Sequence, residues 1–287
     1  MPLQEKKSTL KIVRNDPWLE PYKEAIHGRY AYARQREAEF IGGGKLADFA
    51  DAHLVFGLHK TPEGWTFREW APNATAVYLI GGFNQWTRQD AYKLERLEDG
   101  VWEINLAASQ VKHGQLYKLY VEWPGGAGER IPAYATRVVQ DPDTHLFSCQ
   151  VWEPETPYVF KHKRFKPDTS PLLIYECHIG MAQEGEKVGS YDEFRRLILP
   201  HIAKAGYNAI QIMAIQEHPY YGSFGYHVSN FFAPSSRFGT PEELKELIDE
   251  AHGMGLSVIM DIVHSHAVKN TAEGLAALDG DRSLYFK

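Results

Sequence analysis

Ionisable side chains follow directly after an apolar run near the end of the sequence. The stretch "VIMDIVHSH" spans residues 258–266 and presents Asp261, His264 and His266 after three apolar residues. An Asp can transfer a proton or hold a substrate hydroxyl, and a His can do either or bind a metal ion. Burying such groups without partners is costly. The pattern therefore predicts a cleft at the end of this run.

Two earlier apolar runs end in polar groups as well, at 171–180 ("PLLIYECHIG") and 209–215 ("AIQIMAI"). The polar residues in or directly after them are Glu176, His178, Gln216, Glu217 and His218. In parallel β/α architectures the ligand site lies at the carboxyl ends of the strands. We therefore expect all three runs to be strands whose polar ends line one active-site rim.

Amphipathic helices are predicted between the three runs. Two pairs have the spacing of capping boxes, Ser190 with Glu193 and Thr240 with Glu243. Pro200 is expected to kink or split the first helix. The order β-α-β-α-β, with strands that are apolar on both faces, indicates a parallel sheet covered by helices. The loop 216–239 is long and rich in aromatic residues, and we expect Phe231 and Phe232 to pack over the barrel or against the preceding domain.

The rest of the chain divides into segments that differ in composition and in the spacing of their apolar residues. Short alternating stretches such as "LYKLYVEW" (116–123), separated by glycine-rich turns, predict a β-sandwich. The predicted organisation is a helical segment at 1–50, a sandwich at 51–150, a linker at 151–168 and a partial (β/α) barrel at 169–287.

Bulk composition excludes several classes of protein. The chain has a net charge of −6, whereas a nucleic-acid-binding domain is typically basic. There is no apolar run long enough to span a membrane and no secretory signal, so we expect no membrane partner. The two cysteines, Cys149 and Cys177, form no disulfide framework, which favours a reducing compartment and a cytoplasmic location.

The opening stretch has two chemical interpretations. The spacing His264-x-His266 would place both imidazoles on one face of a strand, as in metal-dependent barrel hydrolases. Alternatively, Asp261 points into the site and 264–266 is loop. In a strand that ran straight to His266, Asp261 would face away from both histidines, and a metal centre would lose its nearest carboxylate.

Several long motifs together resemble a known family. "IYECHIG", "LPHIAKAGYNAIQIMAIQEHPYYGSFGYHVSNFFA" and "DIVHSHAVKN" are similar to glycogen and starch branching enzymes of the eukaryotic type, within the α-amylase superfamily. "FREWAPNATAVYLIGGFNQW" resembles the carbohydrate-binding β-sandwich of those enzymes. The resemblance covers about residues 15–287. It implies a multidomain fold: an N-terminal helical segment, a β-sandwich carbohydrate-binding module, and the first three β/α units of a TIM (β/α)₈ barrel.

The resemblance also implies roles for individual residues. Tyr226 matches the tyrosine that stacks on the sugar at the cleavage subsite, His266 a histidine that hydrogen-bonds that sugar, and Asp261 an aspartate that organises the site. Trp86, with Asn84, matches sugar-contacting positions of the sandwich. The partner implied is an α-glucan such as glycogen, starch or amylose. No cofactor or metal is expected, because Ser265 replaces the calcium-binding Asn of many amylases.

The implied activity is cleavage of a 1,4-α-glucan and transfer of the released chain to a 6-hydroxyl, by a retaining double displacement. The nucleophile and acid/base of the family are expected beyond Lys287, so the chain is expected to be the N-terminal part of such an enzyme and inactive alone. Three parallel strands would also leave an unpaired edge and an uncovered apolar face. The alternatives are a glucan-binding module without catalysis, an amylase or debranching-type hydrolase, and the metal-dependent hydrolase above.

Overall fold

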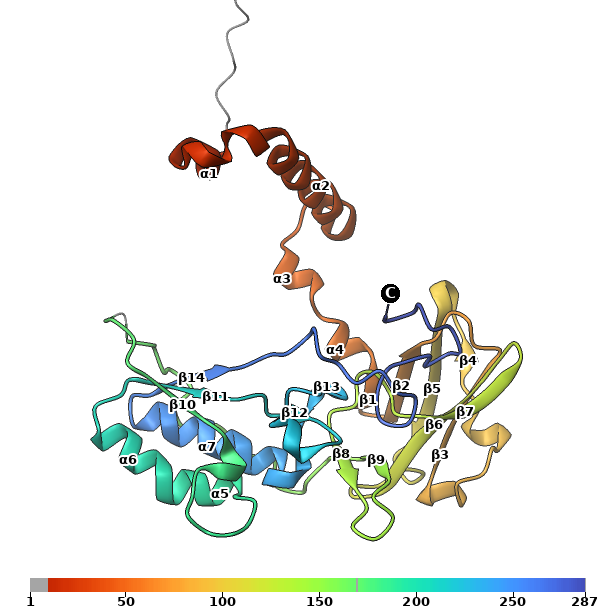
Figure 1. Ribbon diagram of the computed structural model, residues 1–287. Helices are drawn as coiled ribbons and strands as arrows, with labels where there is room; N and C mark the ends of the chain where they lie inside the picture. The colour runs from red at the N-terminus through yellow and green to blue at the C-terminus, as the bar shows by residue number, and fades with distance from the viewer. Residues whose placement is uncertain (1–9, 169, 287) are drawn as a thin grey trace, which may run out of the picture. The chain divides into compact units, whose positions relative to one another are not determined.

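The computed structural model describes residues 10–168 and 170–286, and the chain divides into two compact units, Met1–Val55 and Phe56–Lys287 (Figure 1). The first unit is helical, which confirms the predicted helical N-terminal segment. Its elements are α1 (Lys11–Asn15), the 3₁₀ helix η1 (Pro17–Tyr22), α2 (Lys23–Ile41), α3 (Leu46–Phe49) and α4 (Ala52–Val55). Gly42 ends α2 in the left-handed conformation (φ +54°), the C-terminal position at which glycine is favoured.

The second unit begins with two antiparallel sheets, as predicted. The first sheet has the order β1-β2-β5-β4: Gly57–Lys60, Gly64–Trp70, Val101–Ala107 and Glu95–Arg96. The second has the order β3-β6-β9-β8, with β7 also paired to β6: Ala76–Gly81, Leu116–Trp123, Phe147–Gln150, Val138–Gln140 and Gly126–Arg130. Short 3₁₀ turns lie between strands: η2 (Gly82–Asn84), η3 (Asp90–Tyr92) and η4 (Glu98–Gly100).

Strand alternation builds the core between these sheets. Tyr117, Leu119 and Val121 of β6 are buried on one face, as the sequence pattern predicts. They lie in one apolar cluster with residues of the first sheet, and the Phe67 ring of β2 meets Tyr117 edge-on, with the ring centres 6.4 Å apart. Burial of such aromatic rings is a large part of the stabilisation of a small sandwich.

A three-stranded parallel sheet follows, in the order β10-β11-β14: Ile174–Cys177, Ala209–Ile212 and Ser257–Met260. The helices cover one face of it: α5 (Tyr191–Glu193), the π-helical turn η6 (Phe194–Ile198), α6 (Leu199–Lys204) and α7 (Pro241–Gly253) (Figure 1). The prediction of strands buried on both faces holds only for the central strand β11, where the neighbours Ala209 and Ile210, which face opposite sides of the sheet, are both buried. Because β10 and β14 are edge strands, Ile174 and Met260 are exposed.

The helices follow their predicted signals. Both capping boxes form, with the Ser190 and Thr240 hydroxyls accepting from the backbone N–H groups of Glu193 and Glu243. Pro200 lies in the first turn of α6, directly after the π-helical turn. The proline therefore splits the helix, because its ring prevents a continuous α-helical register through that position.

The segment between β11 and α7 contains β12 (Gln216–Glu217), β13 (Asn230–Pro234) and the 3₁₀ turns η7 (Tyr221–Ser223) and η8 (Ser236–Phe238). A shorter turn, η5 (Ile179–Met181), follows β10. As expected, both phenylalanines of β13 meet the sandwich. Phe231 packs against its core, and Phe232 stacks on Tyr134, whose other neighbour is Phe56.

The chain after β14 returns to the sandwich (Figure 1). Leu275 and Leu278 belong to the core of the sandwich. The buried Asp279 accepts a hydrogen bond from the Asn73 N–H at 2.8 Å, and the Asn73 side-chain amide donates to the Asp279 carbonyl at 2.9 Å. The parallel sheet and the sandwich are therefore joined at both the β13 segment and this last segment.

Candidate functional site

Asp261, which directly follows β14, meets Tyr226 of the segment between β11 and α7. The strand pattern predicts only Asp261 at this edge, and Tyr226 is a candidate through the family resemblance. The Tyr226 hydroxyl donates a hydrogen bond of 2.8 Å to Asp261 Oδ2. This bond, together with burial, raises the pKa of Tyr226 to about 12, and the charge of Glu176 at the end of β10 adds to the shift. Residues from the ends of β10 and β14 and from the segment after β11 therefore face one another.

The backbone around Tyr226 is held by a close approach that needs glycine. Gly225 has φ +88°, and a Cβ there would lie 1.8 Å from the carbonyl oxygen of Ala214. The preceding Phe224 also has a positive φ, of 55°, which is rare and strained for a bulky residue. Asp261 is fixed by its own backbone, because its N–H donates to the Ile212 carbonyl at 3.2 Å. The Tyr226 segment is thus held against Ala214, just after β11, and Asp261 is held by Ile212, the last residue of β11.

The histidines of the opening stretch make other contacts. β14 ends at Met260, so residues 261–266 are not strand. The alternation of a strand therefore does not decide whether Asp261 faces the same side as the two histidines. His264 is exposed and stacks on Phe231, with ring centres 5.9 Å apart. His266 is also exposed, and its Nδ1 lies 3.1 Å from the Ser265 hydroxyl. Within the described part of the chain, no group of three or more His, Cys, Asp or Glu residues could hold a metal ion.

The predicted rim is wrong for four of its members, because His178, Gln216, Glu217 and His218 are buried. Glu217 is 0% exposed. Its carboxylate accepts from the Ser236 N–H at 2.7 Å and hydroxyl at 2.8 Å, and Arg237 lies 3.4 Å away. Burial raises the pKa of Glu217, while the Ser236 bonds and the Arg237 charge oppose the shift. Glu217 therefore holds the aromatic segment in place, because the segment folds back over it.

The buried histidines beneath this segment are neutral at ordinary pH. Burial lowers the pKa of both His178 and His218. His218 Nδ1 lies 2.9 Å from the Gln216 carbonyl, and the His178 ring sits edge-on against Tyr221, Phe224 and Phe238. These contacts make them part of the packing of the aromatic segment.

The second predicted sugar-contacting region is the turn after β3. Asn84 is buried; its Oδ1 accepts from the Gly81 N–H and its Nδ2 donates to the Leu79 carbonyl, both at 2.9 Å. Gln85 and Trp86 follow with φ of 56° and 58°, and the Trp86 side chain is 40% exposed. The amide of Asn84 is thus committed to the turn. The structure makes it a positioning group for Trp86, while the indole is free to meet a ligand.

Three residues beside Trp86 were missed by sequence reasoning. A cavity of about 390 Å³ beside the indole is also lined by Arg88, Tyr120 and Glu129. The Arg88 guanidinium lies over the Tyr120 ring, 4.8 Å from its centre, and pairs with Glu122 at 2.7 Å. The alternation of β6 holds the signal for Tyr120, because a residue between the buried Leu119 and Val121 must face outward.

Two family descriptions match this chain. "Carbohydrate-binding module 48 (Isoamylase N-terminal domain)" matches residues 55–142, and "Alpha amylase, catalytic domain" matches residues 197–278. The first match covers the strands of the sandwich from β1 to β8, and the second runs from the end of η6 past β14. The predicted domain boundaries stay predictions.

Two relatives match almost the entire chain over part of their own length. The 1,4-alpha-glucan-branching enzyme of Dictyostelium discoideum is 45% identical over 288 residues, which cover 96% of this chain and 41% of the relative. The 1,4-alpha-glucan-branching enzyme 2-2, chloroplastic/amyloplastic, of Arabidopsis thaliana is 48% identical, covering 96% of this chain and 35% of the relative. This chain is homologous to the N-terminal part of 1,4-alpha-glucan-branching enzymes. It spans about two fifths of the length of those relatives.

Solved structures share the fold of this branching-enzyme homologue. A pullulanase from Bacillus acidopullulyticus aligns with a TM-score of 0.62 at 17% identity, over 76% of this chain and 30% of the pullulanase. A pullulanase from Paenibacillus barengoltzii complexed with maltotetraose aligns with a TM-score of 0.60 at 22% identity, over 74% and 38%. In the described residues, no helix has the length and apolarity that crossing a bilayer requires.

Proposed function

We propose that the whole protein is a 1,4-α-glucan-branching enzyme and that this chain supplies part of its glucan-binding surface. The observation that carries the proposal is the 2.8 Å hydrogen bond between Tyr226 and Asp261. It joins the two motif residues that the resemblance places at the cleavage subsite, although they lie far apart in the sequence. We also propose that the protein is cytoplasmic, although the name of the Arabidopsis relative places that protein in plastids.

The proposed chemistry assigns binding and positioning to these residues. Tyr226 stacks on the sugar ring beside the bond that is cut, and Asp261 holds the phenol in place while His266 meets a sugar hydroxyl. Retaining cleavage also needs a carboxylate nucleophile and a carboxylic acid/base on either side of the glycosidic bond. The family resemblance assigns neither role to a residue of this sequence, so we expect the 287 residues to bind glucan without branching it.

An iodine-stain assay tests the absence of branching by this chain. Amylose is incubated with the purified chain, and the absorption maximum of the iodine complex is followed. We expect no shift, and equal spectra for the wild type and Tyr226→Ala. A shift that the Tyr226→Ala change removes would contradict the expectation, because it would show that this chain holds a working site.

A second candidate function, glucan retention by the sandwich alone, is favoured by the exposed Trp86 beside its cavity. Affinity electrophoresis through amylopectin measures it directly. We expect Trp86→Ala to reduce the retardation of the chain, with Trp70→Phe as a matched control on the neighbouring sheet. Equal retardation of the wild type and Trp86→Ala would remove Trp86 from the glucan-binding surface.

A further inference from the structure

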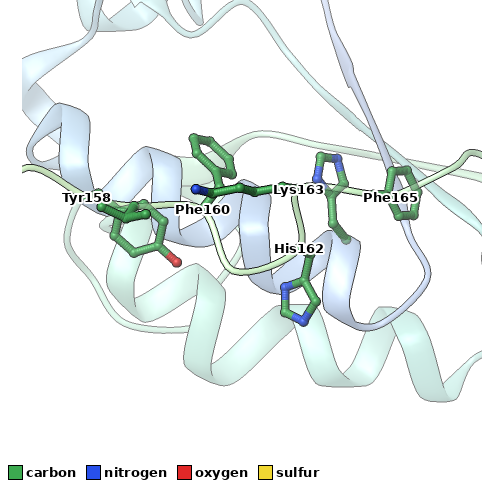
Figure 2. Close-up of a pocket in the computed structure, with 7 residues that line it drawn as sticks. Tyr158, Phe160, His162, Lys163 and Phe165 are labelled. Atoms are coloured by element: carbon green, nitrogen blue, oxygen red, sulfur yellow. The ribbon is translucent and has the colours of Figure 1, made fainter.

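The segment that joins the sandwich to the parallel sheet forms a pocket against α7. We call residues 158–165 the connecting strap. A cavity of about 570 Å³ opens between the strap and α7 (Figure 2). The residues that line it are Tyr158, Val159, Phe160, His162, Lys163, Phe165 and His252. None of the candidate sugar-contacting residues described above contributes to it.

A single buried carboxylate fixes the shape of the strap. Asp249 of α7 is fully buried and accepts hydrogen bonds from the Tyr158 hydroxyl (2.7 Å), the Lys161 N–H (2.7 Å) and the His162 N–H (2.8 Å). Burial alone would raise the pKa of Asp249, but these bonds lower it below its usual value. The strap is therefore anchored to the helix, and the pocket walls are pre-formed.

The pocket offers aromatic faces and a neutral imidazole. Phe165 stacks on His252 with ring centres 4.1 Å apart and planes 5° from parallel, and Tyr158 meets Phe160 edge-on at 5.7 Å. Burial lowers the pKa of His252, so at neutral pH its ring has one donor and one acceptor nitrogen. Flat apolar faces beside a group that both donates and accepts suit a sugar ring with its hydroxyls.

The strap also concentrates positive charge in an acidic chain. The run "KHKRFK" (161–166), which extends one residue past the strap, contains Lys161, Lys163, Arg164 and Lys166, whereas the whole chain has a net charge of −6. Among the described residues, none of these four side chains has an ion-pair partner. The side chain of Lys163 is directed along the strap toward Phe160 (Figure 2). Unpaired cations beside a stacking surface favour a phosphate group, for which lysine and arginine are the usual protein donors.

We propose that the strap pocket binds a phosphorylated glucosyl unit, with the sugar ring against Phe160 and the phosphate on Lys163. The glucosyl class rests on the proposed function, while the phosphate follows from the unpaired cations. Two sources share this chemistry, a free sugar phosphate and a phosphate ester on a glucan chain.

Isothermal titration of the full chain tests the proposal with defined probes. Glucose 6-phosphate and a phosphorylated maltodextrin are the positive probes, and maltose and inorganic phosphate are their halves. We expect saturable binding of a phosphorylated probe and about tenfold weaker binding of either half, because stacking and charge act together. Tighter binding of glucose 6-phosphate indicates the free source, and tighter binding of the maltodextrin indicates the polymer; either supports the pocket.

Matched variants locate the binding. Lys163→Ala should weaken it about tenfold. Lys166→Ala removes the same charge from the same run but does not line the cavity, so it should change the affinity less than about twofold. Phe160→Ala should weaken the phosphorylated probe and leave inorganic phosphate unchanged. Thermal unfolding checks that each variant is folded.

Three results would overturn the proposal: no saturable binding of either phosphorylated probe, equal loss in Lys163→Ala and Lys166→Ala, or binding of an acidic peptide in preference to both probes. Retention on neutral amylopectin distinguishes failure of the strap-pocket proposal from failure of the proposed glucan-binding function. Lys163→Ala should keep that retention, whereas Trp86→Ala should lose it and still bind glucose 6-phosphate.

Discussion

The two candidate sugar-contacting regions are built in opposite ways. At the sandwich turn, Asn84 bonds to Leu79 and Gly81, so the residues that present Trp86 lie within a few positions of it. At the end of the parallel sheet, Tyr226 and Asp261 are 35 positions apart and meet only because β11 and β14 are neighbours. A contiguous motif therefore encodes the first region, whereas the second depends on the packing of a whole segment.

The supporting polar groups differ as well. The turn relies on a neutral amide, while the segment bearing Tyr226 folds over the buried carboxylate of Glu217 and the guanidinium of Arg237. A buried charge that loses its partner costs more than an unpaired amide. The comparison therefore predicts a graded series, in which the region around Tyr226 is the more fragile.

Glu217→Ala should give the largest effect. It leaves the Ser236 N–H without its acceptor and removes the opposite charge from Arg237, which keeps the His218 and Pro219 carbonyls and the Gln140 side chain as acceptors, at a cost of about 3–5 kcal/mol in the free energy of unfolding. Urea unfolding measures this loss. The matched control is Glu153→Ala, which removes an exposed carboxylate 3.8 Å from Lys60 and should cost less than about 1 kcal/mol. Similar losses in the two variants would refute the structural role of Glu217.

The sandwich contains a buried acid, Glu69, and the stability of the protein should therefore fall as the pH rises. Glu69 is fully buried, and burial raises its pKa to about 7, although the Ala133 and Trp70 N–H groups donate to it. The folded state then holds a proton that the unfolded state releases, so stability falls as pH rises from about 4.5 through 7. The expected loss between about pH 5 and about pH 8 is about 2–3 kcal/mol.

Glu69→Gln tests this pH dependence, because the amide keeps the shape and does not ionise. Its unfolding free energy should lack the fall that the wild type shows over the same range. At every pH the variant should lose about 1–3 kcal/mol in the free energy of unfolding, since its side-chain NH₂ faces a backbone donor. Parallel pH curves for the two proteins would contradict the raised pKa.

Local signals in the sequence predicted much of this fold. The capping boxes at Ser190 and Thr240, the split at Pro200 and the three parallel strands depend on neighbours within a few residues. The position of Asp261 at the carboxyl edge of the sheet also followed from the strand order, whereas Tyr226 was a candidate only through the family resemblance. These inferences need only the strand order and no side-chain detail.

Burial of individual polar residues could not be predicted in the same way. Glu217 and His218 look like rim residues in the sequence, and they are buried because the distant Ser236 and Phe238 fold back over them. Asn84 looks like a sugar ligand, but its amide is used by the turn. In each case a tertiary contact decides whether a polar group meets water, a ligand or the backbone.

Asn84→Ala should have an intermediate effect confined to the sandwich. It leaves the Gly81 N–H and the Leu79 carbonyl unpaired, for a loss of about 2 kcal/mol. Because Trp86 is held in the left-handed conformation after this turn, retardation in amylopectin should also fall. Gln89→Ala, which removes weaker bonds at the same turn, is the control and should cost less than about 1 kcal/mol. Loss of stability with unchanged retardation would separate the turn from glucan binding.

Tyr226→Phe should have the smallest effect and shows whether the two regions are independent. It removes one partly exposed hydrogen bond to Asp261, worth about 1 kcal/mol, and keeps the aromatic face. Combined with Asn84→Ala, the losses should add within about 0.5 kcal/mol, because the residues share no partners. Urea unfolding of the two single variants and the double variant measures this. A larger coupling would show that the turn and the strand ends communicate through the interface where Tyr134 stacks on Phe232.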